Sequence, residues 1–361
     1  MTTPANRPAD IDDAWAPPHP RETADLIGHE RAERTLHTAV ATGRLAHAWL
    51  IAGPKGVGKA TLAYRLARYL LAGGGGGGEL LGTASAPNGL YLAPDSPAFG
   101  QVRAGSHPGL LVIERGFDRR SKKLRGEIVV DDVRRLQGFF GLTAADGGWR
   151  VAIVDAADEL NRNAANALLK MLEEPPARGL LLLLARAPGR LPATIRSRCR
   201  RLVLHPLTDA QVLEIVAARR SDLNAADRTL VTKLAAGSPG RAFALVAEGG
   251  LDLYRDMTAL MDRLPRMDVP DVYALADRLG RDDDRFRLFI DLFESWLSAH
   301  IKGLACANAR TPSTGTIAPW TALWEKAQAL IYGAQTLNLE SRQVVVTLFY
   351  GAAAAAAGRQ P

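Results

Sequence analysis

A glycine-rich stretch with one well-placed lysine is the first feature of this sequence that could do chemistry. It lies between a predicted strand and a predicted helix and consists of Gly53, Pro54, Lys55, Gly56, Val57, Gly58, Lys59, Ala60 and Thr61. Glycines let successive backbone N–H groups turn toward one anion, and the following helix adds its positive end. The ammonium group of Lys59 would reach the β- and γ-phosphates of a nucleotide. The stretch therefore predicts a phosphate-binding loop for ATP or ADP.

Metal binding at this loop is expected to be weak. A Ser or Thr hydroxyl normally follows the lysine and binds Mg²⁺, but this sequence has Ala60 there. Thr61 is rotated by about 100° around the helix and should not replace that hydroxyl. Phosphate can still be held, whereas Mg²⁺ loses an inner-sphere ligand and its binding is doubtful.

A second acidic position follows the apolar run 151–154, which reads as a strand ending at Asp155. We expect Asp155 to belong to the nucleotide site and to hold Mg²⁺ through water. Asp158 and Glu159 come shortly afterwards. Two readings of them stay open: charges at a helix entry, which the helix dipole favours, or a relocated general base.

These residues need a scaffold, and the hydrophobic pattern indicates an α/β fold. Solidly apolar strands that alternate with helices predict a parallel sheet covered on both faces. The predicted strands are 48–52, 110–114, 150–154, 180–184 and 201–204, and the helices between them are 30–42, 59–72, 130–140 and 164–172. Beyond residue 206 the strand pattern ends and only helices are expected.

The chain is expected to have four regions. They are a flexible, proline-rich N-terminal arm over 1–22, a nucleotide-binding α/β domain over 23–206, a small helical lid over 207–248 and a helical C-terminal domain over 249–361. Six glycines, 73–78, begin a Gly- and Pro-rich insertion that runs to residue 108. No packed element would tolerate such a glycine run, and its use cannot be inferred from the sequence.

Composition excludes several classes of protein. The cysteines are Cys199 and Cys306, too few for a disulfide scaffold or a four-thiolate zinc site. No apolar run approaches the roughly 18–20 residues of a membrane span, and the N-terminus does not read as a signal peptide. We therefore expect a cytoplasmic protein. The net charge of +7 is dispersed over the chain, which makes it a weak sign of an acidic partner.

Several motifs then occur in one order along residues 25–245. They are the segments 26–29, 47–50, 53–61, 105–108, 164–176, 191–199 and 237–241. The most specific are the run Asn166 to Lys170 followed by Glu173 to Pro176, and the triplet Ser197, Arg198 and Cys199. Together these segments resemble the clamp-loader branch of the AAA+ ATPases, most closely its delta-prime subunits from bacterial DNA polymerase III.

The resemblance implies a RecA-like α/β domain, a three-helix lid and a helical collar. The collar joins five subunits in a ring that contains delta and tau/gamma subunits. Such a ring uses ATP to open the sliding β clamp and place it on primer-template DNA. By the same resemblance, Arg198 is the arginine finger that completes a neighbour's ATP site, and Arg241 points from the lid toward bound phosphate.

The resemblance has open points and one departure. An ordinary surface arginine remains the alternative for both Arg198 and Arg241. The assignment of the arginine finger is also less specific because three other arginines lie nearby in the sequence, Arg196, Arg200 and Arg201. Many relatives carry a four-cysteine zinc module where this chain has its insertion over 73–108. The insertion has no cysteine, so we expect no zinc and no other metal ligand set.

Three replacements affect the hydrolysis of ATP. Ala60 removes the metal hydroxyl, Ala156 stands where AAA+ hydrolases carry a glutamate base, and Ala185 falls at the water-orienting position, although the adjacent Arg186 softens that last point. Losing even one such group commonly costs orders of magnitude in rate. The sequence thus favours a stationary clamp-loader subunit with little hydrolysis of its own. The alternatives are an active tau/gamma-type ATPase and a P-loop kinase; no polymerase site is recognisable.

Overall fold

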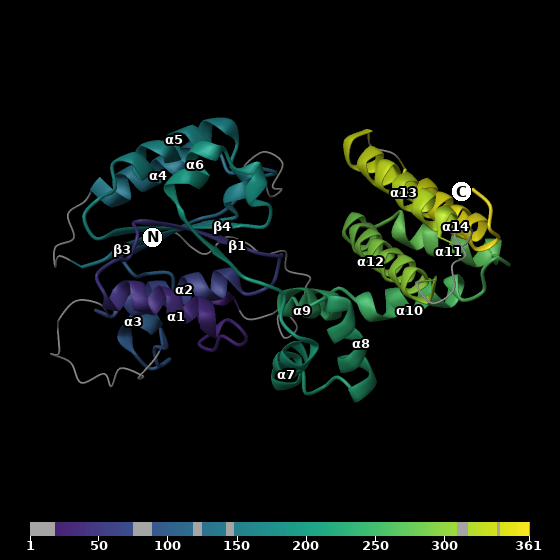
Figure 1. Ribbon diagram of the computed structural model, residues 1–361, viewed down its shortest axis with the longest axis horizontal. Helices are drawn as coiled ribbons and strands as arrows, with labels where there is room; N and C mark the ends of the chain where they lie inside the picture. The colour runs from purple at the N-terminus through teal and green to yellow at the C-terminus, as the bar shows by residue number, and fades with distance from the viewer. Residues whose placement is uncertain are drawn as a thin grey trace. The chain divides into compact units, whose positions relative to one another are not determined.

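The computed structural model describes residues 19–74, 89–117, 125–141, 148–308, 317–337 and 340–360 (Figure 1). Most of the predicted N-terminal arm and residues 75–88 of the predicted insertion lie outside these ranges. The described chain divides into two compact units. An α/β unit consists of residues 19–221 and 235–241, and a helical unit consists of residues 222–234 and 242–360.

The α/β unit is built on a parallel sheet in the order β2-β3-β4-β1-β5. Its strands are β1 (Ala48–Ala52), β2 (Leu110–Ile113), β3 (Arg150–Asp155), β4 (Gly179–Ala185) and β5 (Arg200–Val203). Every residue of β1 and β4 is buried, as expected for central strands covered on both faces. The predicted α/β fold with a parallel sheet is confirmed.

Helices cover both faces of this sheet (Figure 1). One face carries α4 (Val130–Gly141), α5 (Arg162–Glu173) and α6 (Ala193–Arg198), and the other carries α1 (Glu30–Ala41), α2 (Lys59–Leu71) and α3 (Pro97–Arg103). Alternating residues of a strand point to opposite faces. Ala48 and Leu50 of β1 accordingly pack with α4 to α6 in one core. The sequence pattern did not predict α3 and α6, which have only 7 and 6 residues.

In the described residues beyond β5, the remaining regular elements are helices, as predicted. α7 (Asp209–Arg219) belongs to the α/β unit, and the remaining helices are α8 (Ala225–Ala235), α9 (Pro239–Ala247), α10 (Gly250–Met261), α11 (Val269–Leu279), α12 (Asp283–Asn308), α13 (Ala318–Leu337) and α14 (Ser341–Ala356). Within the described ranges, none of the helices combines the length and the apolar character needed to cross a membrane.

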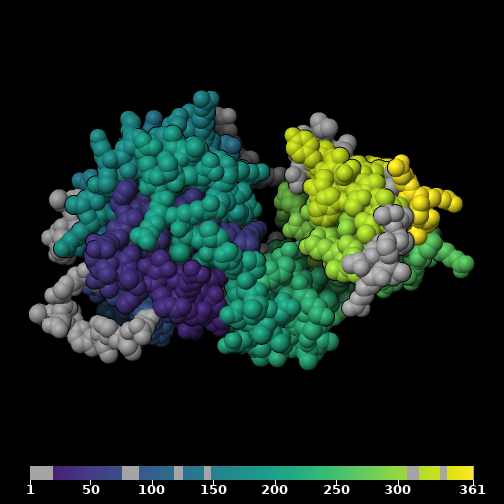
Figure 2. All heavy atoms as spheres, in the orientation of Figure 1, coloured from purple at the N-terminus to yellow at the C-terminus, as the bar shows by residue number. Residues whose placement is uncertain are grey.

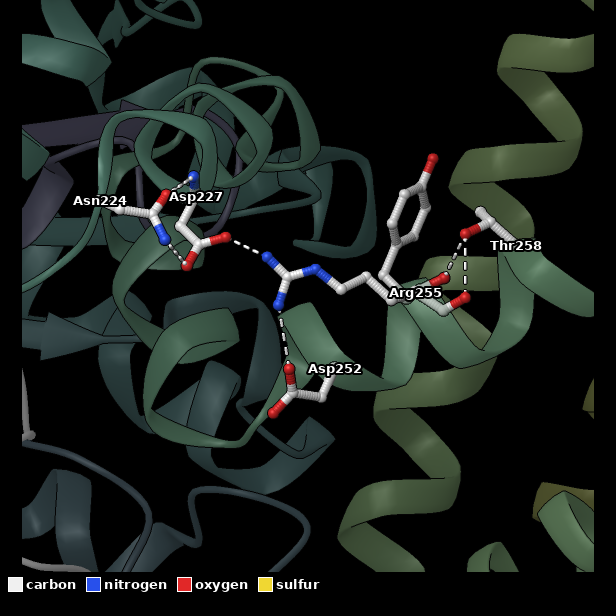
Figure 3. Close-up of polar contacts among 6 residues, drawn as sticks. Asn224, Asp227, Asp252, Arg255 and Thr258 are labelled. Carbon is white, nitrogen blue, oxygen red and sulfur yellow. Dashed lines mark hydrogen bonds and ion pairs between the residues drawn. The ribbon is translucent and has the colours of Figure 1, made fainter.

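The predicted lid, 207–248, is shared between the two units because its parts have different partners. The backbone N–H of Leu207 donates to the carbonyl of Gly237 at 2.8 Å, which keeps residues 235–241 with the sheet. Helix α8 is joined instead to α10. The Arg255 guanidinium forms ion pairs with Asp227 of α8 and with Asp252 of its own helix, the latter at 3.0 Å (Figure 3). The side chain of Asn224 holds Asp227 in place, donating at 2.9 Å.

Two buried arginines of α2 fix the beginning of the described chain. Arg68, which is 1% exposed, donates to the carbonyls of Arg21 at 3.0 Å and Thr23 at 2.7 Å. Arg65 pairs with Glu33 of α1 at 2.7 Å between Nε and Oε1, and both side chains are close to 10% exposed. At the end of the expected arm over 1–22, residues Pro20–Glu22 form a short 3₁₀ helix.

Candidate nucleotide site and finger arginine

The glycine-rich loop connects β1 to α2 at the carboxyl end of the sheet. Gly56 and Gly58 adopt φ angles of +78° and +111°, a region that L side chains rarely enter. Gly58 is the N-cap, and α2 begins at Lys59. The local fold therefore has the features of an anion site: a turn with left-handed glycines that leads into a helix N-terminus.

Lys59 is held by its own loop. Its Nζ donates to the carbonyls of Gly53 at 2.8 Å and Pro54 at 2.7 Å. Only 8% of the residue is exposed. Burial lowers the pKa of Lys59, and the attraction of the Asp155 carboxylate works in the opposite direction. The ammonium group would have to exchange these carbonyls for phosphate oxygens in order to bind a nucleotide.

A histidine that precedes α1 makes a hydrogen bond to the backbone of the loop. The ring of His29 is buried, and its Nε2 lies 2.7 Å from the carbonyl oxygen of Val57. Because a carbonyl can only accept, Nε2 must carry the proton and donate it. Sequence reasoning assigned no role to His29, although it follows Gly28 in a recognised motif. The available signal was a polar residue directly after a glycine in that motif; the structure gives Gly28 a φ of +81°.

Backbone from the first turn of α9 lies directly against the loop. The N–H of Gly240 donates to the carbonyl of Gly56 at 2.9 Å. A Cβ built on Gly56 would lie 2.8 Å from the backbone nitrogen of Arg241, and one built on Gly240 would lie 2.7 Å from the Cα of Gly56. The structure thus brings the predicted site residue Arg241 to the loop through its backbone, with two glycines in close contact.

Asp155 is the last residue of β3, at the same carboxyl end of the sheet as the loop. Burial raises the pKa of its carboxyl group, and the nearby charge of Lys59 only partly offsets this effect. Opposite charges normally shift both pKa values toward ionisation. Here both groups shift toward their neutral forms, so burial outweighs the attraction between them. The next residue, Ala156, offers no carboxylate.

The two later acids are engaged with protein groups. The Asp158 carboxylate accepts from the backbone N–H of Arg186 at 3.2 Å and from that of Ala187 at 2.9 Å. Glu159 pairs with Arg115 at 2.8 Å and with the Arg186 side chain at 2.9 Å. These contacts favour a structural role for both acids, which fasten the turn after β4. They give no support to a relocated general base.

The residues around the loop fit a phosphate better than a metal–nucleotide complex. Gly53 to Lys59 and the start of α2 would hold phosphate oxygens through backbone N–H groups and one ammonium. Mg²⁺ prefers several oxygen ligands in octahedral geometry, and Ala60 supplies none. Among the described residues, no three His, Cys, Asp or Glu side chains gather into a metal-binding group. Residues 75–88 of the predicted insertion are not among the described residues.

Arg198 lies at the amino end of the parallel strands, whereas the loop lies at their carboxyl end. It is the last residue of α6, and β5 begins two residues later, running parallel to β1. The loop follows the end of β1, whereas Arg198 precedes the start of β5. A strand the length of β1 spans about 16 Å. The structure therefore places Arg198 well away from the other predicted site residues of this chain.

Arg198 is a surface residue. Its side chain is 39% exposed, and the atoms around α5 and α6 form part of the outer surface in Figure 2. The neighbouring Cys199 is partly buried, and burial raises the pKa of its thiol to about 11. That thiol is consequently a poor nucleophile at physiological pH.

Comparisons with known proteins match about half of the chain. The sequence model of a family described as "DNA polymerase III, delta subunit" matches residues 28–208. The chain is 37% identical to the DNA polymerase III subunit delta' of Pseudomonas aeruginosa over 204 residues, which cover 56% of this chain and 57% of the relative. It is 36% identical to the delta' subunit of Escherichia coli over 203 residues, 56% of this chain and 55% of the relative. The match thus spans little more than half of each relative.

Solved structures give weaker overall likeness. A DNA polymerase III gamma subunit-related protein from Thermotoga maritima has a TM-score of 0.40 at 16% identity, covering 88% of this chain and 98% of that one. The RuvB branch-migration motor of the same organism has a TM-score of 0.42 at 19% identity, covering 92% and 90%. At such scores the fold assignment rests on the sheet itself. The family match extends over half of the sequence and includes the loop, Asp155 and Arg198, and the chain belongs to the DNA polymerase III delta-subunit family.

Proposed function

We propose that this chain is a delta-prime-type stator of a bacterial clamp loader. It would support the ATP-driven loading of the sliding β clamp onto primed DNA in the cytoplasm, and hydrolyse little or no ATP itself. Its direct partners would be the delta and tau/gamma subunits of a five-membered ring. The β clamp and primer-template DNA would be indirect partners.

The observation that carries this proposal is the separation of Arg198 from the chain's own loop. The loop follows the carboxyl end of β1, whereas Arg198 precedes the amino end of the neighbouring parallel strand β5, so the two lie at opposite ends of the strands. An arginine so placed has no access to a phosphate bound at Lys59, yet its exposed guanidinium remains available to a second subunit. A permanently charged planar fork suits the γ-phosphate oxygens of a neighbour's nucleotide.

The chain's own site supports the other half of the proposal. ATP or ADP would bind weakly, since Lys59 must first leave the carbonyls of its own loop. Ala60 and Ala156 give Mg²⁺ and water no side-chain ligand. A tau/gamma-type motor would need a hydroxyl and a carboxylate at these two positions, so we do not favour that alternative.

Replacing Arg198 tests the proposal in the reconstituted ring. Arg198→Ala should leave assembly intact and slow the DNA-stimulated ATPase at the neighbouring site by at least tenfold, given that arginine fingers contribute about 10³–10⁵ in GTPases. Arg196→Ala is a matched control: it lies on the same short helix but points about 200° away around the axis. Equal ATPase rates for the wild-type and Arg198→Ala rings would refute the proposed role.

A further inference from the structure

The backbone of Arg198 is fixed from both sides. Ile195, one turn earlier in α6, is fully buried in the core beneath the helix. Two residues later, Arg200 pairs with Trp49 of β1 as the first residue of β5. The chain therefore has no freedom to swing at position 198, and any adjustment of the guanidinium must come from side-chain rotation.

Two contacts settle that rotation. Nη2 of Arg198 lies 2.9 Å from Oε1 of Glu173, and Nη1 donates to the carbonyl of Thr194 at 3.0 Å. The guanidinium therefore lies between the carboxyl end of α5, where Glu173 stands, and a carbonyl in the first turn of α6. Arginine has further N–H donors in its planar fork, and the side chain keeps 39% of its surface exposed. The two contacts orient the head group without burying it.

Glu173 is itself held in a defined position. It is the last residue of α5, and Pro175 and Pro176 prevent the helix from continuing. One residue earlier, the carbonyl of Leu172 accepts from Nε2 of His47, just before β1, at 3.2 Å. A carboxylate at a helix C-terminus is disfavoured by the helix dipole. Glu173 therefore does not stabilise its own helix, and its ion pair with Arg198 is the contact that gives this acid a role.

We propose that Glu173 is a positioning residue for the arginine finger. By holding one side of the Arg198 guanidinium, it limits the rotamers that a free arginine would sample. The remaining donors are then presented to the neighbouring subunit's nucleotide in one orientation. This inference depends on the proposed function, in which Arg198 acts on a second subunit.

The experiment uses the ring reconstituted from full-length subunits with primed DNA and clamp. Four variants of this chain are compared: Glu173→Gln, Glu174→Gln, Arg198→Ala, and the double variant of Glu173 and Arg198. Glu174→Gln removes the same charge from the adjacent position and serves as the matched control. Thermal unfolding of each variant first establishes that it is folded, and kcat and KM for ATP are then measured separately.

Glu173→Gln should lower kcat about two- to fivefold with KM for ATP unchanged, which corresponds to losing one partly exposed ion pair. Glu174→Gln should retain the wild-type kcat. In the Arg198→Ala background, Glu173→Gln should cause no further loss, because its effect passes through that arginine.

Two outcomes would overturn the inference. One is an unchanged kcat in Glu173→Gln, and the other is an equal fall with and without Arg198. A ring whose ATPase is insensitive to Arg198→Ala would instead refute the proposed function itself. The two failures are therefore distinguishable.

Discussion

The contact between Gly56 and Gly240 gives a sharp test of how the loop is packed. In Gly240→Ala, the new Cβ would lie 2.7 Å from the Cα of Gly56, whereas ordinary van der Waals contact begins at about 3.4 Å. The two backbones must therefore separate by roughly 0.7 Å. That movement stretches the hydrogen bond from Gly240 N–H to the Gly56 carbonyl, now 2.9 Å long, beyond its useful range.

The expected cost has two parts. Overpacking at a contact without slack costs about 1–3 kcal/mol, and the lost hydrogen bond adds about 1 kcal/mol. Gly240→Ala should consequently lower the free energy of unfolding by about 2–4 kcal/mol. For a unit of this size, the melting temperature should fall by about 5–15 °C.

Gly138→Ala is the matched control. Gly138 is an exposed helix residue of α4, and a Cβ built there meets nothing within 4 Å. Removing a helical glycine should stabilise by about 0.5–1 kcal/mol. Urea and thermal unfolding of the full chain should therefore show opposite signs for the two substitutions. If Gly240→Ala is as stable as the wild type, the close approach of this segment to the loop is wrong.

Three further predictions concern single side chains. Glu33→Ala removes the carboxylate partner of the buried Arg65 guanidinium and should lower the free energy of unfolding in urea by about 3–5 kcal/mol. Asp131→Ala breaks an exposed ion pair of 2.9 Å and should lower it by less than about 1 kcal/mol. Similar costs for the two variants would contradict the burial of the Arg65–Glu33 pair. Burial raises the pKa of Asp155 from 3.8, so its stabilising contribution is present at lower pH and is lost as pH rises through the native pKa. The free energy of unfolding of Asp155→Asn should therefore increase relative to that of the wild type toward neutral pH. A difference that does not change with pH would refute this. A thiol reagent at pH 8 should label exposed Cys306 well before Cys199, whose pKa is about 11, and Cys306→Ser should leave only the slow phase.

The sequence was most informative where one strong pattern acts locally. The apolar run 48–52 became β1 with the predicted bounds, since five buried residues in a row fit a central parallel strand. The helix predicted from residue 59 begins there because the preceding glycine serves as its N-cap. The shape of the loop could thus be anticipated from a few neighbouring residues.

Long-range contacts limited the prediction of the site. Nothing near Glu173 in the sequence indicates a partner 25 positions later, and the pairing arises only because α5 and α6 pack against the same face. The brace from His29 to Val57 spans 28 positions for the same reason. The strand order was not predicted either; it places β5 beside β1, and because these strands run parallel, Arg198 before β5 lies at the end opposite the loop after β1.

Close packing against neighbouring backbone requires glycine at two positions of the loop, independently of nucleotide binding. A Cβ on Gly53 would lie 2.6 Å from the carbonyl oxygen of Leu204, and one on Gly56 would meet the backbone of Arg241. Both positions exclude a side chain whether or not phosphate binds. A chain that lost hydrolysis would therefore still need glycine there, so the motif identifies ancestry and fold. Under the proposed function, the residues that distinguish a motor from a stator are Ala60 and Ala156, both of which are half-buried.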